Sequence, residues 1–78
     1  MKVALKLPRF GMNMEEAQVV RWLKQVGETF KTGEPLYEIE TDKVTTAVEA
    51  PCDGTIVEIV AGQDSTIAVG AVVCRIET

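Results

Sequence analysis

The sequence predicts an all-β fold, a flattened barrel or sandwich of eight short strands. Two observations support this prediction. Short stretches of β-branched or alternating residues are separated by turn residues at regular intervals, as in small sandwiches and barrels. In addition, residues 19–41 are similar to residues 56–78 when the chain is shifted by 37 positions. Two segments that repeat in this way should adopt one backbone conformation, so we expect two halves related by a rough two-fold axis.

The internal repeat is carried by identical residues and by shared apolar positions. Ile39-Glu40-Thr41 aligns with Ile76-Glu77-Thr78, and Gly33 aligns with Gly70. The other matching pairs are Val19 with Ile56, Val20 with Val57, Trp22 with Ile59, Leu23 with Val60, Thr29 with Thr66, Phe30 with Ile67 and Leu36 with Val73. Among the apolar residues, those expected in the core are Val19, Trp22, Phe30, Leu36 and Ile39.

The first copy of the repeat is ambiguous when it is considered alone. Its apolar residues recur every three or four positions, which is typical of an amphipathic helix. The second copy removes the ambiguity, because residues 56–60 are mostly β-branched and Gly62 follows in a turn-rich stretch. A helix through Gly62 would lose helix propensity. We therefore expect strands in both copies and, over the whole chain, at residues 2–7, 17–24, 29–31, 35–41, 44–49, 54–61, 66–68 and 72–77.

One turn stands out, the two-residue connection Asp42-Lys43. Aspartate is common in turns, whereas the second position of such a hairpin usually prefers glycine rather than lysine. Because the repeat makes Thr41 equivalent to Thr78, this hairpin should lie at one end of the barrel and the chain termini at the other. A tether attached at either terminus would then leave the hairpin free.

Lys43 has two interpretations. A single exposed lysine usually does no more than keep a loop soluble. Here, however, it is the only basic residue between Lys31 and Arg75, and it occupies the tip of a short hairpin. A modifying enzyme needs an amine on a rigid and protruding support, and loops held by rigid scaffolds are the usual carriers of function. The sequence therefore favours Lys43 as an attachment site.

Composition and charge argue against several classes of protein. A net charge of −4 with scattered basic residues argues against nucleic-acid binding, which needs clustered Lys and Arg. No apolar run approaches the roughly 20 residues of a membrane span, so we expect a soluble protein with no membrane partner. The chain has no histidine, and Cys52 and Cys74 fit small apolar residues in a reducing compartment. We expect neither catalytic residues nor a metal site.

Several motifs resemble one family along essentially the whole chain. GEPLYEIETDKV at residues 33–44 resembles the lipoylation motif of 2-oxo acid dehydrogenase complexes and of their acetoin-cleaving relatives. PRFGMNMEEA at residues 8–17, Trp22 and APCDG at residues 50–54 resemble the same family. This resemblance implies the barrel-sandwich hybrid fold of biotinyl and lipoyl attachment domains. It also implies a single non-catalytic lipoyl-carrier domain over residues 1–78.

The resemblance assigns expected roles to individual residues. It implies that Lys43 carries lipoic acid, covalently bound through an amide at Nζ. Asp42 would orient the tip for the lipoate-attaching enzyme or would only stabilise the turn. Glu40 would add to recognition of the attachment hairpin or would belong to a solvated strand face. The loop that contains Met12 and Met14 would lie beside the tip, either as a contact for the decarboxylase or as local packing.

The resemblance also implies the partners of the carrier. The arm would accept an acyl group from a thiamine-diphosphate-dependent dehydrogenase component and pass it to an acyltransferase core and on to coenzyme A. Dihydrolipoamide dehydrogenase would then reoxidise the arm. We expect the isolated domain to be monomeric and to be the N-terminal part of a longer acyltransferase. The expected location is the cytoplasm of a bacterium or archaeon, or the mitochondrial matrix if the chain was trimmed from a eukaryotic precursor.

Two other interpretations of the hairpin lysine remain open on the sequence alone. A biotin carrier shares the fold, but its lysine is typically flanked by methionines, whereas Lys43 is flanked by Asp42 and Val44. An unmodified hairpin-barrel module would serve as an interaction or structural domain, as in some membrane-fusion adaptors, but such modules usually lie in longer chains with helical insertions. The presence and the identity of a group on Lys43 would separate these interpretations from a lipoyl carrier.

Overall fold

A computed structural model of the protein describes residues 1–9, 14–41 and 44–78. The described residues form eight strands and no helix, as the sequence predicted. The strands are β1 (Lys2–Lys6), β2 (Glu16–Trp22), β3 (Thr29–Phe30), β4 (Pro35–Glu40), β5 (Thr45–Glu49), β6 (Gly54–Ile59), β7 (Thr66–Ala68) and β8 (Val72–Glu77). Each lies within two residues of its predicted bounds. In this part of the chain, no helix exists that could cross a membrane.

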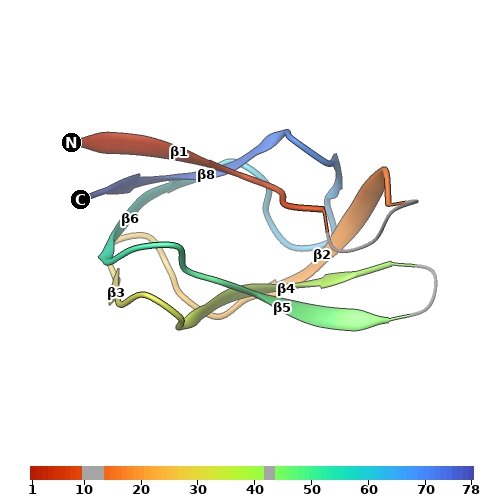
Figure 1. Ribbon diagram of the computed structural model, residues 1–78, viewed down its shortest axis with the longest axis horizontal. Coiled ribbons are helices and arrows are strands. Elements are labelled where there is room, and N and C mark those ends of the chain that lie inside the picture. Colours follow the sequence, from red (N-terminus) through yellow and green to blue (C-terminus); the bar gives the residue numbers. More distant parts are fainter. Residues whose placement is uncertain (10–13, 42–43) are drawn as a thin grey trace.

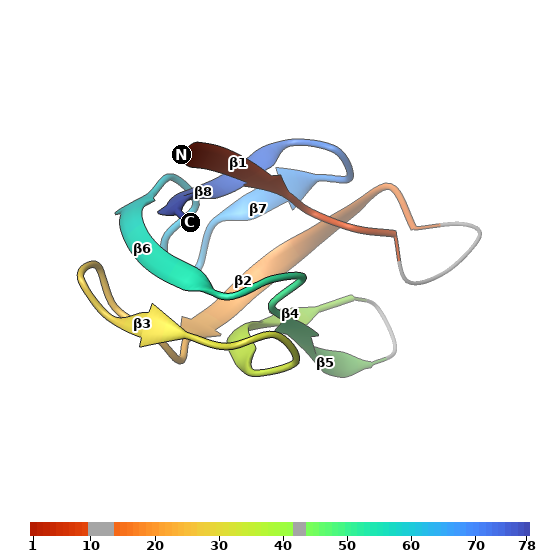
Figure 2. The same ribbon diagram turned by 60° about the vertical axis from the view of Figure 1, so that its left-hand side comes forward.

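The described strands form two antiparallel four-stranded sheets that enclose the apolar core. The strand order is β1-β8-β6-β3 in the first sheet and β5-β4-β2-β7 in the second. Figure 1 shows β1 and β8 in one layer and β4 and β5 in the other, and Figure 2 shows the same arrangement from another side. The architecture is therefore the predicted flattened sandwich.

The two sheets are equivalent under the repeat seen in the sequence. Val19 pairs with Ile39 between β2 and β4, and Ile56 pairs with Ile76 between β6 and β8. Both ladders then shift register at the next residue of β2 and β6, which is a β-bulge that the strand pattern did not predict. Shared pairing and shared irregularity confirm that the halves are related by a pseudo-two-fold axis.

The edge strands β1 and β5 are equivalent as well. Leu5 of β1 pairs with Cys74 in the first sheet, and Val48 of β5 pairs with Tyr37 in the second. Because Tyr37 and Cys74 are related by the repeat, Leu5 and Val48 occupy the same place in the two halves. The sequence overlay did not reveal this relationship, since few residues of β1 and β5 are alike.

Two glycine turns secure these edge strands in the same way. Gly33 and Gly70 have positive φ angles of 88° and 89°, a backbone conformation that side chains other than glycine rarely adopt. The amide of Gly33 donates to the carbonyl of Ala50 at 2.9 Å, and the amide of Gly70 donates to the carbonyl of Leu7 at 3.0 Å. The identical glycines of the repeat are therefore explained by one turn that occurs twice.

The strands β2 and β6 both end two residues earlier than predicted, and for the same reason. The amides of Leu23 and Lys24 both donate to the carbonyl of Leu36. The amides of residues 60 and 61 likewise share the carbonyl of Val73. In an antiparallel pair, only every second residue of a strand bonds to the same neighbouring strand. Two successive amides that share one carbonyl break this pattern, so the strand ends there. The ends of both strands are thus set by hydrogen bonding.

The core lies between the sheets and contains most of the residues predicted for it. Val19, Phe30, Leu36 and Ile39 are buried, whereas Trp22 is half-buried and packs against the core from its margin. The fully buried side chains are Leu7, Val19, Leu36, Tyr37, Ile39, Ile56, Val73, Cys74 and Ile76. The indole N–H of Trp22 explains its position, because it donates to the carbonyl of Ala61 at 2.7 Å and so needs a polar margin.

Candidate attachment site

The predicted site lies where β4 ends and β5 begins. Glu40 pairs with Thr45 as the last rung of the β4–β5 ladder. Beyond it, the backbone N–H of Thr41 donates to the carbonyl of Val44 at 2.9 Å. The hydroxyl of Thr41 donates to the same carbonyl at 3.4 Å. Thr41 thus donates both of the hydrogen bonds that connect the ends of β4 and β5. We call this pair of bonds the closure of the hairpin.

Asp42 and Lys43 lie outside the described residues, so their expected roles stay predictions. The flanking side chains are accessible. Glu40 is exposed and forms no ion pair with any described residue. Val44 is 57% exposed. An enzyme that approached this end of the hairpin could therefore contact both residues.

The strand that leads to the site is held rigidly. Ile39, next to Glu40, is fully buried. β4 lies between β5 and β2, so both of its edges are hydrogen-bonded. On its outer face, Arg21 of β2 donates through Nε to a carboxylate oxygen of Glu38 at 2.6 Å. Core packing, two neighbouring strands and this ion pair together give the hairpin a fixed base.

The equivalent place in the other half is formed by the chain termini. The amide of Thr78 donates to the carbonyl of Met1 at 2.9 Å, and its hydroxyl donates to the same carbonyl at 3.3 Å. These bonds copy the two bonds from Thr41 to Val44. Figure 1 shows the termini at one end of the molecule and the end of β4 at the opposite end. The termini are therefore separated from the end of β4, as the predicted position of the hairpin requires.

The connection between β1 and β2 was expected beside the tip. The chain that follows β1 and the start of β2 both lie toward the end of the molecule where β4 ends, as Figures 1 and 2 show. Residues 10–13, which include Met12, lie outside the described residues. Met14 is half-buried and packs against the core, which supports local packing for this residue.

The described residues contain little other candidate chemistry. Within residues 1–9, 14–41 and 44–78, no group of three or more histidine, cysteine or acidic side chains could hold a metal ion. Cys74 is fully buried, and burial raises the pKa of its thiol to about 11. This thiol is protonated and unreactive at neutral pH. Cys52 is half-buried and is not joined to Cys74 by a disulfide.

The described residues form two equivalent sheets, with the end of β4 opposite the chain termini. The family described as "Biotin-requiring enzyme", the biotin/lipoyl attachment family, matches residues 3–76. The chain belongs to this family. Within the family it is similar to the lipoyl domains of dihydrolipoamide acyltransferases, as the following relatives show.

The relatives come from more than one multienzyme complex. The acetyltransferase component of the pyruvate dehydrogenase complex of Corynebacterium glutamicum is 47% identical over 92% of this chain. The succinyltransferase component of the 2-oxoglutarate dehydrogenase complex of Rickettsia conorii is 44% identical over 90% of it. The matched regions are 11% and 18% of these relatives, so the chain spans a small part of their length.

A solved structure supports the same assignment. The lipoyl domain of the 2-oxoglutarate dehydrogenase complex of Azotobacter vinelandii superimposes with a TM-score of 0.77 and 34% sequence identity. The superposition covers 97% of this chain and 96% of that domain. The relative therefore matches the chain as a complete fold and not merely as a local motif.

Proposed function

We propose that Lys43 carries lipoic acid in amide linkage and that the domain works as a swinging-arm carrier of acyl groups and electrons. The observation that carries the proposal is the double closure from Thr41 to Val44. It joins the residues that precede and follow Asp42-Lys43 in the sequence, and the end of β4 lies opposite the termini. A linker at either terminus would leave this end free to visit several active sites.

The chemistry would be divided between the cofactor and the chain. A bound lipoyl group supplies a disulfide that can be reduced and acylated. The chain supplies an amine at a defined place, on a strand fixed by Ile39 and by the neighbouring strands. Tethering raises the effective concentration of the arm at each partner's active site, which is why a carrier needs no substrate pocket of its own.

The proposed partners are supported by relatives that are components of 2-oxo acid dehydrogenase complexes. A lipoate-attaching enzyme would modify Lys43 and would recognise the hairpin through Asp42 and Glu40. A thiamine-diphosphate-dependent dehydrogenase component would then load the acyl group, an acyltransferase core would receive it, and dihydrolipoamide dehydrogenase would reoxidise the arm. The relatives include pyruvate and 2-oxoglutarate complexes at similar identity, so the acyl donor is proposed only as a 2-oxo acid or acetoin.

Attachment is tested by incubating the purified chain with lipoate ligase or with biotin ligase and measuring the intact mass. We expect a mass increase of one lipoyl group with the first enzyme and no change with the second. The Lys43→Arg variant keeps the positive charge and should remain unmodified. Addition of biotin would assign the chain to the biotin carriers, and no addition by either ligase would favour an unmodified interaction module.

The acyl donor is tested on the lipoylated chain. Purified dehydrogenase components of the pyruvate, 2-oxoglutarate and acetoin systems would each be supplied with their labelled substrate. Transfer of label to the domain by one component, at a rate well above those of the others, identifies the complex. Failure of all three to label a domain that carries lipoate would contradict the swinging-arm role while leaving the attachment intact.

A further inference from the structure

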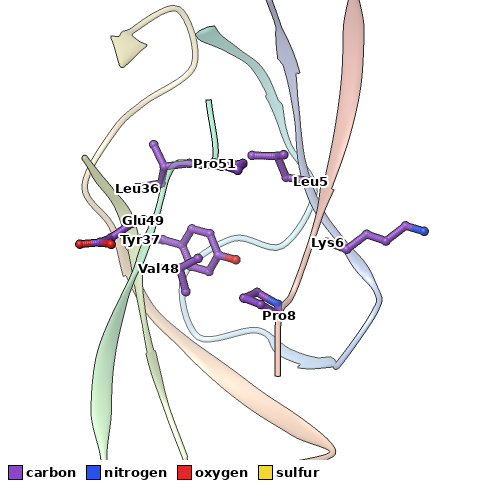
Figure 3. Close-up of a pocket in the computed structure, with 8 residues that line it drawn as sticks. All are labelled: Leu5, Lys6, Pro8, Leu36, Tyr37, Val48, Glu49 and Pro51. Atoms are coloured by element: carbon purple, nitrogen blue, oxygen red, sulfur yellow. The ribbon is translucent and has the colours of Figure 1, made fainter. Parts of the chain in front are cut away.

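A cavity of about 230 Å³ lies between the two edge strands β1 and β5, away from the hairpin closure. Its walls are mostly apolar. They include Leu5, Pro8, Leu36, Tyr37, Val48 and Pro51, shown in Figure 3. Lys6 and Glu49 also border the cavity, but Figure 3 shows both charged groups directed away from it. The interior therefore offers no charged partner to a ligand.

The cavity lies across the pseudo-two-fold axis. Leu5 is equivalent to Val48, and Pro8 is equivalent to Pro51, since β5 follows β1 by the same interval of 43 positions. The lining is thus nearly symmetric in its apolar part. Tyr37 breaks this symmetry, because its counterpart in the other half is Cys74. A single polar group from one half consequently distinguishes the two sides of the cavity.

The hydroxyl of Tyr37 is the polar group that a ligand in the cavity could use. Its residue is only 1% exposed, and no hydrogen bond joins the hydroxyl to any described residue. The oxygen is nevertheless not fully enclosed, since no fully buried side-chain oxygen or nitrogen of the described residues lacks a partner. Figure 3 shows the hydroxyl directed across the cavity toward β1. Burial and the nearby Cys74 raise the pKa of this phenol, so it remains a neutral donor. Water can satisfy this donor at the opening of the cavity, and a bound acceptor would replace that water and take the hydrogen bond in apolar surroundings.

Size and polarity restrict what the cavity could hold. Sites for drug-sized ligands usually have volumes of about 300–1,000 Å³, so a nucleotide or a flavin would not fit. A charged ligand would lose its hydration without gaining a partner. We propose that the cavity binds a compact, neutral carbonyl compound, with its hydrocarbon part against the leucine, valine and proline side chains and its oxygen accepting a hydrogen bond from Tyr37. This proposal is independent of Lys43.

The test uses the unmodified chain, labelled with ¹⁵N, and cyclohexanone as the probe. We expect saturable shifts of backbone resonances confined to β1, β4 and β5, with a millimolar dissociation constant. The Tyr37→Phe variant keeps the ring and removes the hydroxyl, and it should weaken binding by roughly 3- to 10-fold, as the loss of one hydrogen bond would. An unchanged dissociation constant for this variant would overturn the proposal.

A second pair of variants tests the location without the hydroxyl. Leu5→Phe places a larger side chain at the cavity wall, whereas Leu23→Phe makes the same change at another half-buried leucine that does not line the cavity. We expect Leu5→Phe to abolish the shifts and Leu23→Phe to retain them. Equal binding by both variants, or shifts scattered over the whole domain, would overturn the proposal.

Discussion

Thr41 donates two hydrogen bonds to the carbonyl of Val44, one from its backbone N–H at 2.9 Å and one from its hydroxyl at 3.4 Å. Thr78 makes the same two bonds to Met1. In one half, the two bonded residues are connected by residues 42 and 43 of the chain. In the other half, the two bonded residues are the C-terminal and N-terminal residues themselves. The same local structure thus serves a proposed attachment site in one place and holds the chain ends together in the other.

This duplication gives a matched experiment on the closure. Thr41→Pro removes the N–H donor, and we expect the rate of lipoylation to fall by roughly tenfold, which corresponds to the loss of about 1.4 kcal/mol of local stability. Thr78→Pro removes the equivalent bond at the other end and should leave the rate unchanged. The rate is measured by intact mass against time, together with the unfolding free energy of each variant. Equal effects of the two variants on lipoylation would show that only global stability matters.

The two sheets carry one ion pair each at equivalent positions, with the charges exchanged. Arg21 of β2 pairs with Glu38 of β4, and Glu58 of β6 pairs with Arg75 of β8. We predict that Arg21→Glu lowers the unfolding free energy by about 0.5–1 kcal/mol, because two carboxylates would then face each other on neighbouring strands. Urea unfolding measures this change.

Exchanging both charges tests whether the positions of this ion pair in the two sheets are equivalent. The double variant Arg21→Glu with Glu38→Arg reproduces the arrangement of residues 58 and 75, so we expect it to recover most of the lost stability. Salt should reduce the difference between the single and double variants, since both side chains are partly exposed. A double variant no more stable than Arg21→Glu would contradict the equivalence of the two sites.

The buried thiol predicts how stability depends on alkaline pH. The pKa of Cys74 is raised from 9.0 to about 11 in the folded protein. Below about pH 9 the thiol is protonated in both states, so its contribution does not change with pH. Between pH 9 and 11 the unfolded chain loses this proton first, and the thiol alone should lower stability by at most about 1.4 kcal/mol per pH unit. Unfolding measured across this range tests the prediction.

Variants of the two cysteines provide the control for this pH dependence. Tyr37, whose pKa burial raises from the ordinary value of 10.0, adds its own loss of stability from about pH 10 upward. In Cys74→Ala we therefore expect the decline to begin at higher pH, whatever the change in absolute stability. Cys52→Ala should keep the original profile, because Cys52 is not fully buried. An unchanged profile for Cys74→Ala would show that another group causes the decline.

Much of the fold could be predicted because the two halves of the chain have similar sequences and the same backbone conformation. The helical spacing from Val19 to Phe30 was resolved only by its copy, where Gly62 and β-branched residues exclude a helix. The bulges at Val20 and Val57 could not be predicted, since they depend on hydrogen bonding between strands. The equivalence of β1 and β5 was also hidden, because edge strands with one exposed face tolerate different residues.

Some features of the site were visible in the sequence and were nevertheless missed. The overlay aligns Arg21 with Glu58 and Glu38 with Arg75, so a charge-exchanged pair could have been inferred from the repeat. The burial of Tyr37 and the cavity beside it had no comparable signal, because they depend on the separation of the two edge strands. The proposed attachment residue, Lys43, was predicted from its isolation among acidic residues and from the motif around it.

Lipoylation of Lys43 is tested by a tryptic peptide map of protein from lipoate-replete cells. Lys43 is the only tryptic site between Lys31 and Arg75, and modification of its amine blocks cleavage. We expect one uncleaved peptide of residues 32–75 that contains the added mass of a lipoyl group. Complete cleavage into residues 32–43 and 44–75, with no added mass, would contradict it.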